Sequence, residues 1–425
     1  MIREEHFDRP RTVVFVECAA AMGGVQFSTL YLAQRLDRTQ WKPVVVCPAD
    51  GELPRACRDA GVEVHVLEQA DLRSTSLRVG SNFRVPNPAA WAWNGYAVGG
   101  AARRLTRFLA QANPALVVTK GLSSHFFGGL AARRLGIPCV WHAQDFISER
   151  SFGIYRRAFG RAARWLPDQI IVDGASIAKQ LPRSLRSRIT VIHNGVDTKL
   201  FRPELDGAVV REELGIPADH LVVGNIGRLT PWKGQHHLIA AFARIADENP
   251  RTTLLLVGSP VFDNDSYQRR LIRTVAQFGL EKRVKFAGYR QDTAQVLAAM
   301  DVFAFTSVEK DTSPLALLSA MSSGLPIVAF DIEGVRELID GDEQILTVPC
   351  AQVNQLAGAL QTLISDKQLR KQLAQSVRLL AERRFSLERH VASIAEVLLQ
   401  VDRQRSPLVH EKKVPDLTRP ASQRS

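Results

Sequence analysis

The sequence predicts an α/β protein of two doubly wound domains, each a parallel sheet with helices on both faces. Three observations lead to this prediction. At 425 residues the chain exceeds what a single hydrophobic core usually supports. Short β-branched runs alternate with stretches of helical periodicity, an order that is typical of parallel sheets. A second series of the same kind follows a Gly-, Asp- and Pro-bearing linker at 194–207.

The candidate strands fall into these two series. In the first series they are the apolar runs 12–16, 43–47, 62–66, 115–119, 138–142, 169–173 and 189–193. In the second series they are 221–226, 253–258, 284–288, 302–305, 326–330 and 345–348. Between the strands, residues such as Leu30, Ala33 and Leu36 recur at helical spacing. Residues 70–96 lack either pattern and are predicted to form a long irregular loop.

These elements predict an N-terminal Rossmann-like domain over 1–200 and a C-terminal one over 201–385. We expect residues 386–405 to form a helix that packs back toward the N-terminal domain. Residues 406–425 show no apolar periodicity and are predicted to be disordered. Ligands of doubly wound domains bind at the carboxyl ends of the strands, so the site is expected in a cleft between the domains.

Composition places the chain among ordinary globular proteins, with 45% hydrophobic and 23% charged residues. The apolar run 13–24 contains Glu17 and ends in two glycines, which indicates a strand and its loop rather than a signal peptide. No run reaches membrane-spanning length. The five cysteines are scattered and include no CxxC pair, which favours reduced thiols in a cytoplasmic protein.

Positive charge is concentrated in the first half of the chain. Residues 1–203 hold 28 Lys and Arg against 16 Asp and Glu, whereas the remaining residues hold 27 of each. This asymmetry predicts an anionic partner for the first half: nucleic acid, a membrane surface or a phosphate-bearing substrate. Nucleic acid is disfavoured because the basic residues lie within βα units and no recognised nucleic-acid motif is present.

The loop between the strand 221–226 and the next helix reads GRLTPWKG and begins at Gly227. Its Arg228 and Lys233 would lie at the mouth of the cleft, where two fixed positive charges neutralise a diphosphate. The alternative is a solvated loop with ordinary surface charges.

A second loop follows the strand 302–305 and leads into another helix. Ser313 is expected to be the N-cap, with Pro314 at the first helical position. This arrangement would aim the free amides of Leu315 and Ala316 into the cleft, where a helix terminus favours a phosphate. Asp311 is placed to accept hydrogen bonds from ligand hydroxyls. The alternative is that Asp311 and Ser313 serve only as turn and cap residues.

Two features of the first domain are also candidates. Gly23 and Gly24 follow the first strand and open a helix, where glycine lets the backbone approach a ligand closely. His142 ends the strand 138–142 and would place an imidazole at the cleft edge, suited to hydrogen bonding or acid–base catalysis. The alternative for His142 is a buried structural histidine.

The ordered motifs across 189–340 resemble glycosyltransferases of family 4, retaining enzymes of the GT-B fold that use nucleotide-sugar donors. The matching pieces are ITVIHNGVDTKLFRP, GRLTPWKGQHHLIAAFARI, LLLVGS, LEKRVKFAGYRQD, AAMDVFAFTS and LLSAMSSGLPIVAFDIEGVRELI. The first half is similar more loosely, through MGGVQFSTLYLAQRL and GIPCVWHAQD.

The resemblance implies roles for the candidate residues. Arg228 and Lys233 correspond to a basic pair that holds the donor diphosphate and stabilises it as a leaving group. The glycines at 23–24 match a loop near the phosphates and the sugar, and His142 matches a histidine that contacts the transferred sugar. Glu337 matches an acidic position near the donor.

One position departs from the pattern of the family. The family has two glutamates eight positions apart, and these correspond here to Asp311 and Ser319. Aspartate keeps a carboxylate, and Glu309 is an alternative to it. Ser319 keeps none, and a hydroxyl binds ribose more weakly than a bidentate carboxylate does. The departure bears on donor affinity, on nucleotide choice and on activity itself.

The resemblance implies transfer of a hexose with retention at the anomeric carbon, from a UDP-sugar or a GDP-sugar, with UDP favoured. No metal and no other cofactor are expected. Residues 263–265 read DND and resemble a metal-binding motif of another glycosyltransferase fold, but their neighbours match GT-B. His236 and His237 are interpreted as helix surface rather than metal ligands.

In the GT-B fold the first domain receives the acceptor, which we expect to be a glycan, lipid-linked or other anionic molecule of cell-envelope polysaccharide or glycolipid synthesis. Residues 147–165 interleave arginines with aromatic residues. This helix either lies on an anionic surface at the inner face of the cytoplasmic membrane or packs its aromatic residues into the domain. The aromatic residues of the predicted loop are of the interfacial kind: Phe83, Trp91, Trp93 and Tyr96.

Two other functions remain open. A catalytically degenerate partner subunit that binds a nucleotide sugar would fit the serine at position 319. A nucleotide-sugar epimerase of the same fold is the second alternative, although the motifs are those of a transferase.

Overall fold

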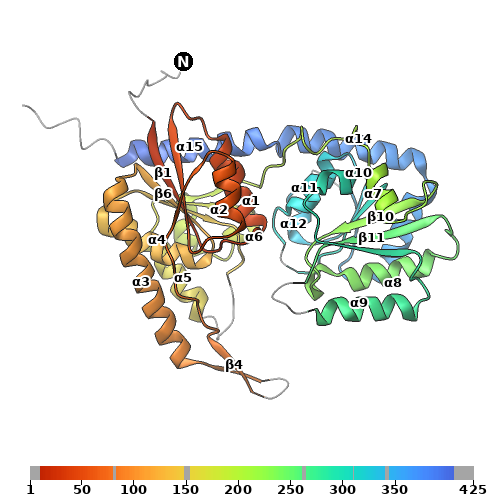
Figure 1. The fold of residues 1–425 in the computed structure, drawn as a ribbon, viewed down its shortest axis with the longest axis horizontal. Helices are drawn as coiled ribbons and strands as arrows, with labels where there is room; N and C mark the ends of the chain where they lie inside the picture. Colours follow the sequence, from red (N-terminus) through yellow and green to blue (C-terminus); the bar gives the residue numbers. More distant parts are fainter. Residues whose placement is uncertain are drawn as a thin grey trace, which may run out of the picture.

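The computed structural model describes residues 10–79, 83–147, 154–260, 265–309, 311–339 and 344–405. Within these residues two α/β domains lie side by side, each with a central parallel sheet covered by helices (Figure 1). The fold class predicted from the sequence is confirmed. The tail at 406–425 lies outside the described residues, so the disorder predicted for it stays a prediction.

In the first domain, the strand order over the described residues is β3-β2-β1-β6-β7-β8-β9, and every pairing is parallel. Residues 13–16 of β1 are completely buried because helices cover both faces of the sheet. The strands are β1 (Arg11–Glu17), β2 (Trp41–Cys47), β3 (Glu63–Val66), β6 (Leu116–Lys120), β7 (Cys139–Ala143), β8 (Gln169–Val172) and β9 (Ile189–Val191). The helices are α1 (Gly24–Arg35), α2 (Glu52–Asp59), α3 (Pro88–Ala112), α4 (Leu122–Leu135), α5 (Ile154–Trp165) and α6 (Ala175–Ala178).

The second domain repeats this architecture with the order β12-β11-β10-β13-β14-β15, again parallel over the described residues. The strands are β10 (Leu221–Ile226), β11 (Thr252–Val257), β12 (Val284–Gly288), β13 (Val302–Phe305), β14 (Ile327–Phe330) and β15 (Leu346–Val348). The helices are α7 (Ala208–Glu213), α8 (Gln235–Ile245), α9 (Ser266–Gln277), α10 (Thr293–Ala298), α11 (Leu315–Ser322), α12 (Glu333–Arg336), α13 (Val353–Ser365) and α14 (Lys367–Arg384).

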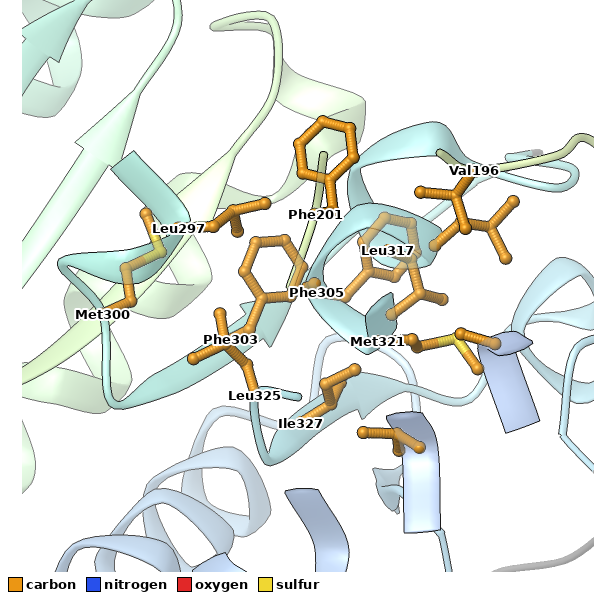
Figure 2. Packing of buried hydrophobic residues seen from close by; sticks show 14 of the residues in the cluster. Val196, Phe201, Leu297, Met300, Phe303, Phe305, Leu317, Met321, Leu325 and Ile327 are labelled. Carbon is orange, nitrogen blue, oxygen red and sulfur yellow. The ribbon is translucent and has the colours of Figure 1, made fainter. Parts of the chain in front are cut away.

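One core cluster of the second domain fixes α11 against the sheet. Figure 2 shows Phe303 and Phe305 of β13 packed with Leu317 and Met321 of α11, and each of these side chains is at most 2% exposed. Burial of such large apolar side chains contributes roughly 1.5–3 kcal/mol each. The start of α11 is thereby held close to the carboxyl end of β13, where ligands of doubly wound sheets bind.

Residues 70–96 are not the irregular loop that the sequence predicted. They contain an antiparallel hairpin of β4 (Ser76–Val79) and β5 (Phe83–Pro86), and the first residues of α3. Figure 1 shows the hairpin projecting away from the body of the first domain. The start of α3 was readable, because Asn87 accepts a hydrogen bond from the amide of Ala90 and Pro88 occupies the first helical position.

The last described helix, α15 (Leu387–Arg405), packs on the first domain. Its buried side chains join the cluster that contains residues of β1 and β2. Asp402 forms an ion pair with Arg11, which also lies 4.6 Å from the centre of the Trp41 ring. The chain therefore crosses between the domains twice. The two crossing segments are hydrogen-bonded to each other, because the amide of Leu387 donates to the carbonyl of Val196 at 2.9 Å.

Candidate active site

The basic loop after β10 is pressed against the loop after β13. Gly234 has a φ of 71°, and a Cβ atom there would lie 2.0 Å from the carbonyl oxygen of Thr306. Only glycine permits this backbone conformation and this contact together. The hydroxyl of Thr306 donates to the carbonyl of Lys233 at 3.0 Å. Two loops that lie far apart in the sequence are thus joined at Lys233.

Lys233 and Asp311, both predicted as site residues, form an ion pair. The hydroxyl of Ser307 also donates to Asp311 at 2.8 Å. The Nζ atom of Lys233 lies 4.4 Å from the centre of the Trp232 ring, and the guanidinium of Arg228 lies 5.4 Å from it. Arg228 and Lys233 are therefore neighbours on one aromatic side chain, with Arg228 exposed to solvent.

The prediction that Ser313 caps α11 is wrong. The N-cap is Pro314, whose ψ of 120° is extended, and its carbonyl accepts the amides of Leu317 and Leu318. Ser313 adopts a left-handed φ of 44°, and its hydroxyl accepts the amide of Asn194 at 2.7 Å instead. The cap hydroxyl is unavailable because the linker between the domains occupies it.

The amides of Leu315 and Ala316 nevertheless remain without a hydrogen-bond partner among the described residues. Gly227 lies against the aliphatic part of Lys233, since a Cβ there would be 3.5 Å from its Cδ atom. Ser319, one turn along α11, is 6% exposed. The second domain thus gathers two cations and two free amides around the loops at 227–234 and 306–316, an arrangement suited to an anion.

The carboxylate of Glu337 forms hydrogen bonds with the opposite domain. Its carboxylate accepts the amides of Ala175 and Ser176 at 2.6 and 3.0 Å, at the start of α6. Close approach is possible because position 174 is a glycine, where a Cβ would lie 2.7 Å from the carboxylate. Figure 1 shows α6 and α12 facing each other between the domains. Glu337 therefore joins the domains, and neither oxygen is left without a partner.

The first-domain glycines lie at the carboxyl end of β1. Gly23 is the N-cap of α1, and its carbonyl accepts the amide of Phe27 at 2.9 Å. A Cβ at Gly24 would meet no atom within 4 Å, so the space beside this backbone is open. Asp145 follows β7 at the same edge of the sheet. Partial desolvation and the nearby Asp173 raise the pKa of Asp145, and the positive charge of Arg228 in the second domain opposes this rise.

His142 is not at the cleft edge as predicted. Its side chain is completely buried, and its Nε2 atom lies 3.2 Å from Asp173. Burial and the nearby positive charge of Lys120 hold the pKa of His142 well below its ordinary value. The imidazole is therefore neutral near pH 7. The cause is the position of β7 inside the sheet, where all five residues are buried.

Sequence reasoning missed a group of buried polar residues beneath this edge of the first sheet. Glu17 accepts hydrogen bonds from Gln26 and Thr29, and burial raises its pKa to about 7. Lys120 pairs with Glu17 in the strand register and donates to the hydroxyl of Ser28 at 2.9 Å. Burial lowers the pKa of Lys120 to about 8. The available signal was a charged residue at the carboxyl end of an apolar strand.

Two cavities lie elsewhere on the first domain. One of about 440 Å³ opens beside Ile137 and Asp168, which precede β7 and β8, and therefore lies at the opposite edge of the sheet from the candidate site. The other, of about 350 Å³, is lined by residues that include Lys42, Glu63 and His65. Neither contains any of the predicted site residues.

The remaining sequence candidates fall outside the site. The residues at 263–264 are not among the described ones, and Asp265 forms an ion pair with Arg269. His236 contacts Tyr267, with 2.8 Å between its Nδ1 atom and the hydroxyl. In the part of the chain that the structure describes, no group of three or more His, Cys, Asp or Glu could hold a metal ion. The helices described there also include none that is long and apolar enough to span a membrane.

Comparisons with known proteins match both halves of the chain. Residues 208–379 match the family model described as glycosyl transferases group 1, and residues 22–200 match the model of glycosyltransferase family 4. The D-inositol 3-phosphate glycosyltransferase of Corynebacterium glutamicum is 28% identical over 342 residues, which cover 73% of this chain and 81% of that protein. The UDP-Gal:alpha-D-GlcNAc-diphosphoundecaprenol alpha-1,3-galactosyltransferase of Escherichia coli is 28% identical over 60% of this chain and 67% of that protein.

Solved structures agree with these matches. Anabaena HepE in complex with UDP and glucose is similar with a TM-score of 0.77 and 26% identity, over 92% of this chain and 99% of that chain. The same protein in complex with UDP-glucose is similar with a TM-score of 0.77 and 25% identity, over 92% and 100%. The chain belongs to the glycosyltransferases of family 4 and has their GT-B fold.

Proposed function

We propose that this glycosyltransferase is a retaining hexosyltransferase that takes its sugar from a nucleotide-diphosphate sugar. The observation that supports this most directly is the ion pair between Lys233, which neighbours Arg228 on the Trp232 ring, and Asp311 in the loop that leads to the free amides of Leu315 and Ala316. Negative charge grows on a diphosphate as the glycosidic bond breaks, and cations and amides that are already in place lower that barrier. Because these groups supply the positive charge, we expect the reaction to need neither a metal nor another cofactor.

We infer that the donor is a UDP-hexose, with GDP-hexose as the second candidate. Support comes from HepE, which is similar over 92% of this chain and whose structures hold UDP with glucose and UDP-glucose. Asp311 would accept hydrogen bonds from sugar hydroxyls. Ser319 would meet the ribose with a single hydroxyl, and this weaker contact predicts lower donor affinity than a carboxylate would give.

We infer that the acceptor is a lipid-linked or otherwise anionic glycan of the cell envelope, received by the first domain. The excess of positive charge in residues 1–203 supports this inference. The relative in Escherichia coli is named for a diphosphoundecaprenol acceptor, which is both lipid-linked and anionic. Retention of the anomeric configuration is carried over from the family and belongs to the proposal.

We also propose a cytoplasmic protein that attaches to the inner face of the cytoplasmic membrane through its first domain. Of the predicted helix at 147–165, the structure describes α5 from Ile154 to Trp165, and residues 148–153 lie outside the described residues. The two interpretations of this helix each find support. Phe159 of α5 is completely buried against Trp141, whereas Trp165 is 66% exposed. The arginines on its exposed side are Arg156, Arg157, Arg161 and Arg164. Flotation with anionic vesicles and not with neutral ones is the expected result, and equal binding to both would contradict attachment by charge.

The donor site is tested by thermal-shift titration with UDP, GDP, ADP and their hexose conjugates. A ligand of the folded state raises the melting temperature by mass action. We expect a shift with UDP and UDP-hexose in the wild type, lost in Lys233→Ala. Lys282→Ala removes an exposed lysine of the same domain and serves as the matched control. A shift that survives in Lys233→Ala would contradict the proposed diphosphate site.

Transfer is tested separately with the donor that binds. Release of free nucleotide that depends on an added lipid-linked glycan supports a transferase, and the anomeric configuration of the product by NMR decides retention. Interconversion of the donor sugar without an acceptor would indicate an epimerase instead. If no nucleotide shifts the wild type but Ser319→Glu restores binding, the chain is a degenerate partner subunit.

A further inference from the structure

The loop that leads into α11 is held by a residue of the linker between the domains. Asn194 is 6% exposed, and its backbone amide donates to the hydroxyl of Ser313 at 2.7 Å. Its side-chain amide donates to the carbonyl oxygen of Ser313 at 3.0 Å. Asn194 therefore donates hydrogen bonds to both the side chain and the backbone of Ser313.

This serine has a strained backbone. Ser313 has a φ of 44°, in the left-handed region that residues with a Cβ rarely adopt. Such conformations persist only where the surroundings hold them. Pro314 follows with a φ of −68° and an extended ψ, and α11 then begins at Leu315. The left-handed turn at Ser313 therefore sets the direction in which α11 starts, and with it the direction of its first two amides.

Residues of the first domain hold Asn194 in turn. Asp173, which follows β8, accepts the side-chain amide of Asn194 at 3.0 Å. Gln144, which follows β7, donates to Asp173 and to the side-chain oxygen of Asn194, both at 3.0 Å. Every polar group of the Asn194 side chain is thus satisfied by a named partner. Because buried polar groups are costly to leave unpaired, this network is specific for one arrangement of the linker.

We propose that Asn194 is a positioning residue for the donor diphosphate, holding Ser313 in its left-handed conformation so that the amides of Leu315 and Ala316 point to the phosphates. Because Asp173 and Gln144 orient Asn194, this alignment depends on the first domain being in place. The inference rests on the proposed donor site and assigns part of that site to the opposite domain.

The experiment compares the binding of UDP with that of uridine, by calorimetry on the full chain. Asn194→Ala should lower the affinity for UDP about tenfold, because the amides of Leu315 and Ala316 would no longer be aligned to donate hydrogen bonds to a charged phosphate. The affinity for uridine, which has no phosphate, should change little. The informative quantity is the ratio of the two affinities. A merely structural role for Asn194 would lower the melting temperature and leave this ratio unchanged.

Two further variants sharpen the test. Glycine adopts positive φ without strain, so Asn194→Ala combined with Ser313→Gly should recover part of the lost UDP affinity. Asn249→Ala is the matched control, because Asn249 is a half-buried asparagine that bonds Ile245 and Gln361 away from the site. It should lower stability and keep the ratio.

The outcomes separate the two proposals. A wild type that binds UDP, with an unchanged UDP-to-uridine ratio in Asn194→Ala, overturns the role of Asn194 and leaves the donor site standing. A wild type that binds neither UDP nor GDP overturns the proposed function and this inference with it. If Asn194→Ala does not fold, Ser313→Ala provides the measurement, because it removes one of the two bonds and should lower the ratio about threefold.

Discussion

At the residue scale, Lys233 is held in position by neighbouring side chains. Its ammonium lies over Trp232 and pairs with Asp311, which also receives the hydroxyl of Ser307. The carboxylate holds the lysine in position while no phosphate is present. A bound diphosphate would share or replace this partner, so Asp311 affects both the cation and any sugar hydroxyl that it contacts.

We therefore expect Asp311→Asn to separate donor binding from transfer. Once the Asp311 carboxylate is removed, the Lys233 ammonium can pair with the diphosphate without competition. UDP should then bind as tightly as in the wild type or up to about tenfold more tightly. Sugar transfer should fall at least tenfold, because the amide accepts hydrogen bonds from the sugar less strongly than a carboxylate does. Calorimetry with UDP and initial rates with the UDP-hexose measure the two effects. Weaker UDP binding would show that Asp311 mainly positions Lys233.

Buried histidines predict how stability depends on pH. Burial lowers the pKa of His125 to about 3, and its ring stacks on Trp141 at 4.8 Å. Because the unfolded chain takes up this proton near pH 6.5 and the folded chain does not, stability is retained above that pH and lost as the pH falls below it. From pH 7 to pH 5 this group alone removes about 2 kcal/mol from the free energy of unfolding.

In His125→Phe the loss of stability between pH 7 and pH 5 should be smaller by about that amount, 2 kcal/mol. Urea unfolding at the two pH values measures it, and the comparison within each variant cancels the lost hydrogen bond to Thr119. His65→Gln, at a partly exposed histidine that contacts Glu63, is the control. An equal pH-dependent loss in the wild type and His125→Phe would show that His125 does not carry this dependence.

At the scale of the elements, the site is made by loops that follow strands. The turn at Pro231–Lys233 ends in Gly234, whose contact with Thr306 joins the β10 loop to the β13 loop. The core of Phe303, Phe305 and Leu317 then fixes α11 beside them. Groups supported by rigid strands and helices are positioned more accurately than groups on unsupported loops.

Gly234→Ala should destabilise the protein more than the same substitution at a glycine of similar φ whose added Cβ meets no other atom. The added Cβ atom would lie 2.0 Å from a backbone oxygen, and the alanine would also have to adopt a φ of 71°. Together these two effects should lower the free energy of unfolding by about 3 kcal/mol. Gly279 is the matched control, because its φ is 67° but its added Cβ would meet nothing within 4 Å. Gly279→Ala should therefore cost only about 1 kcal/mol. Equal losses in urea unfolding would show that the contact with Thr306 is unimportant.

At the scale of the whole molecule, contacts between described residues of the two halves bind the domains together. Glu337 accepts two amides of α6, Lys179 pairs with Glu333, and Asn194 grips Ser313. On the far side, α15 returns to the first domain and buries its apolar face there (Figure 1). The geometry of the candidate site therefore depends on how the two domains are held against each other.

Glu337→Gln should loosen the contact between the domains. An amide accepts only with its single oxygen and loses the charge that favours the start of a helix, so the amides of Ala175 and Ser176 should exchange with solvent about tenfold faster. Hydrogen exchange measured by mass spectrometry on the segment around 175 tests this expectation. Glu396→Gln, at an exposed position of α15, is the control. Unchanged exchange in Glu337→Gln would mean that the other contacts hold the domains alone.

Much of this architecture was accessible from the sequence because strand and helix periodicities are local. The alternation of apolar runs predicted both sheets, and the loops at 227–234 and 306–316 were chosen as the candidate site because ligands bind at the carboxyl ends of parallel strands. The hairpin at 76–86 and the cap of α11 were missed. The cap of α11 could not be read locally because Asn194, which lies 119 positions away in the sequence, takes the hydroxyl of Ser313.

By itself the sequence determined the fold class, the order of the elements and the placement of Arg228 and Lys233 in one loop, since these follow from residue type and spacing along the chain. Only the tertiary structure decided that Lys233 pairs with Asp311, that Glu337 binds the opposite domain and that His142 is buried and neutral. These facts depend on which groups surround each residue and on the desolvation they impose, and both are set by packing between segments that lie 31 to 162 positions apart in the chain.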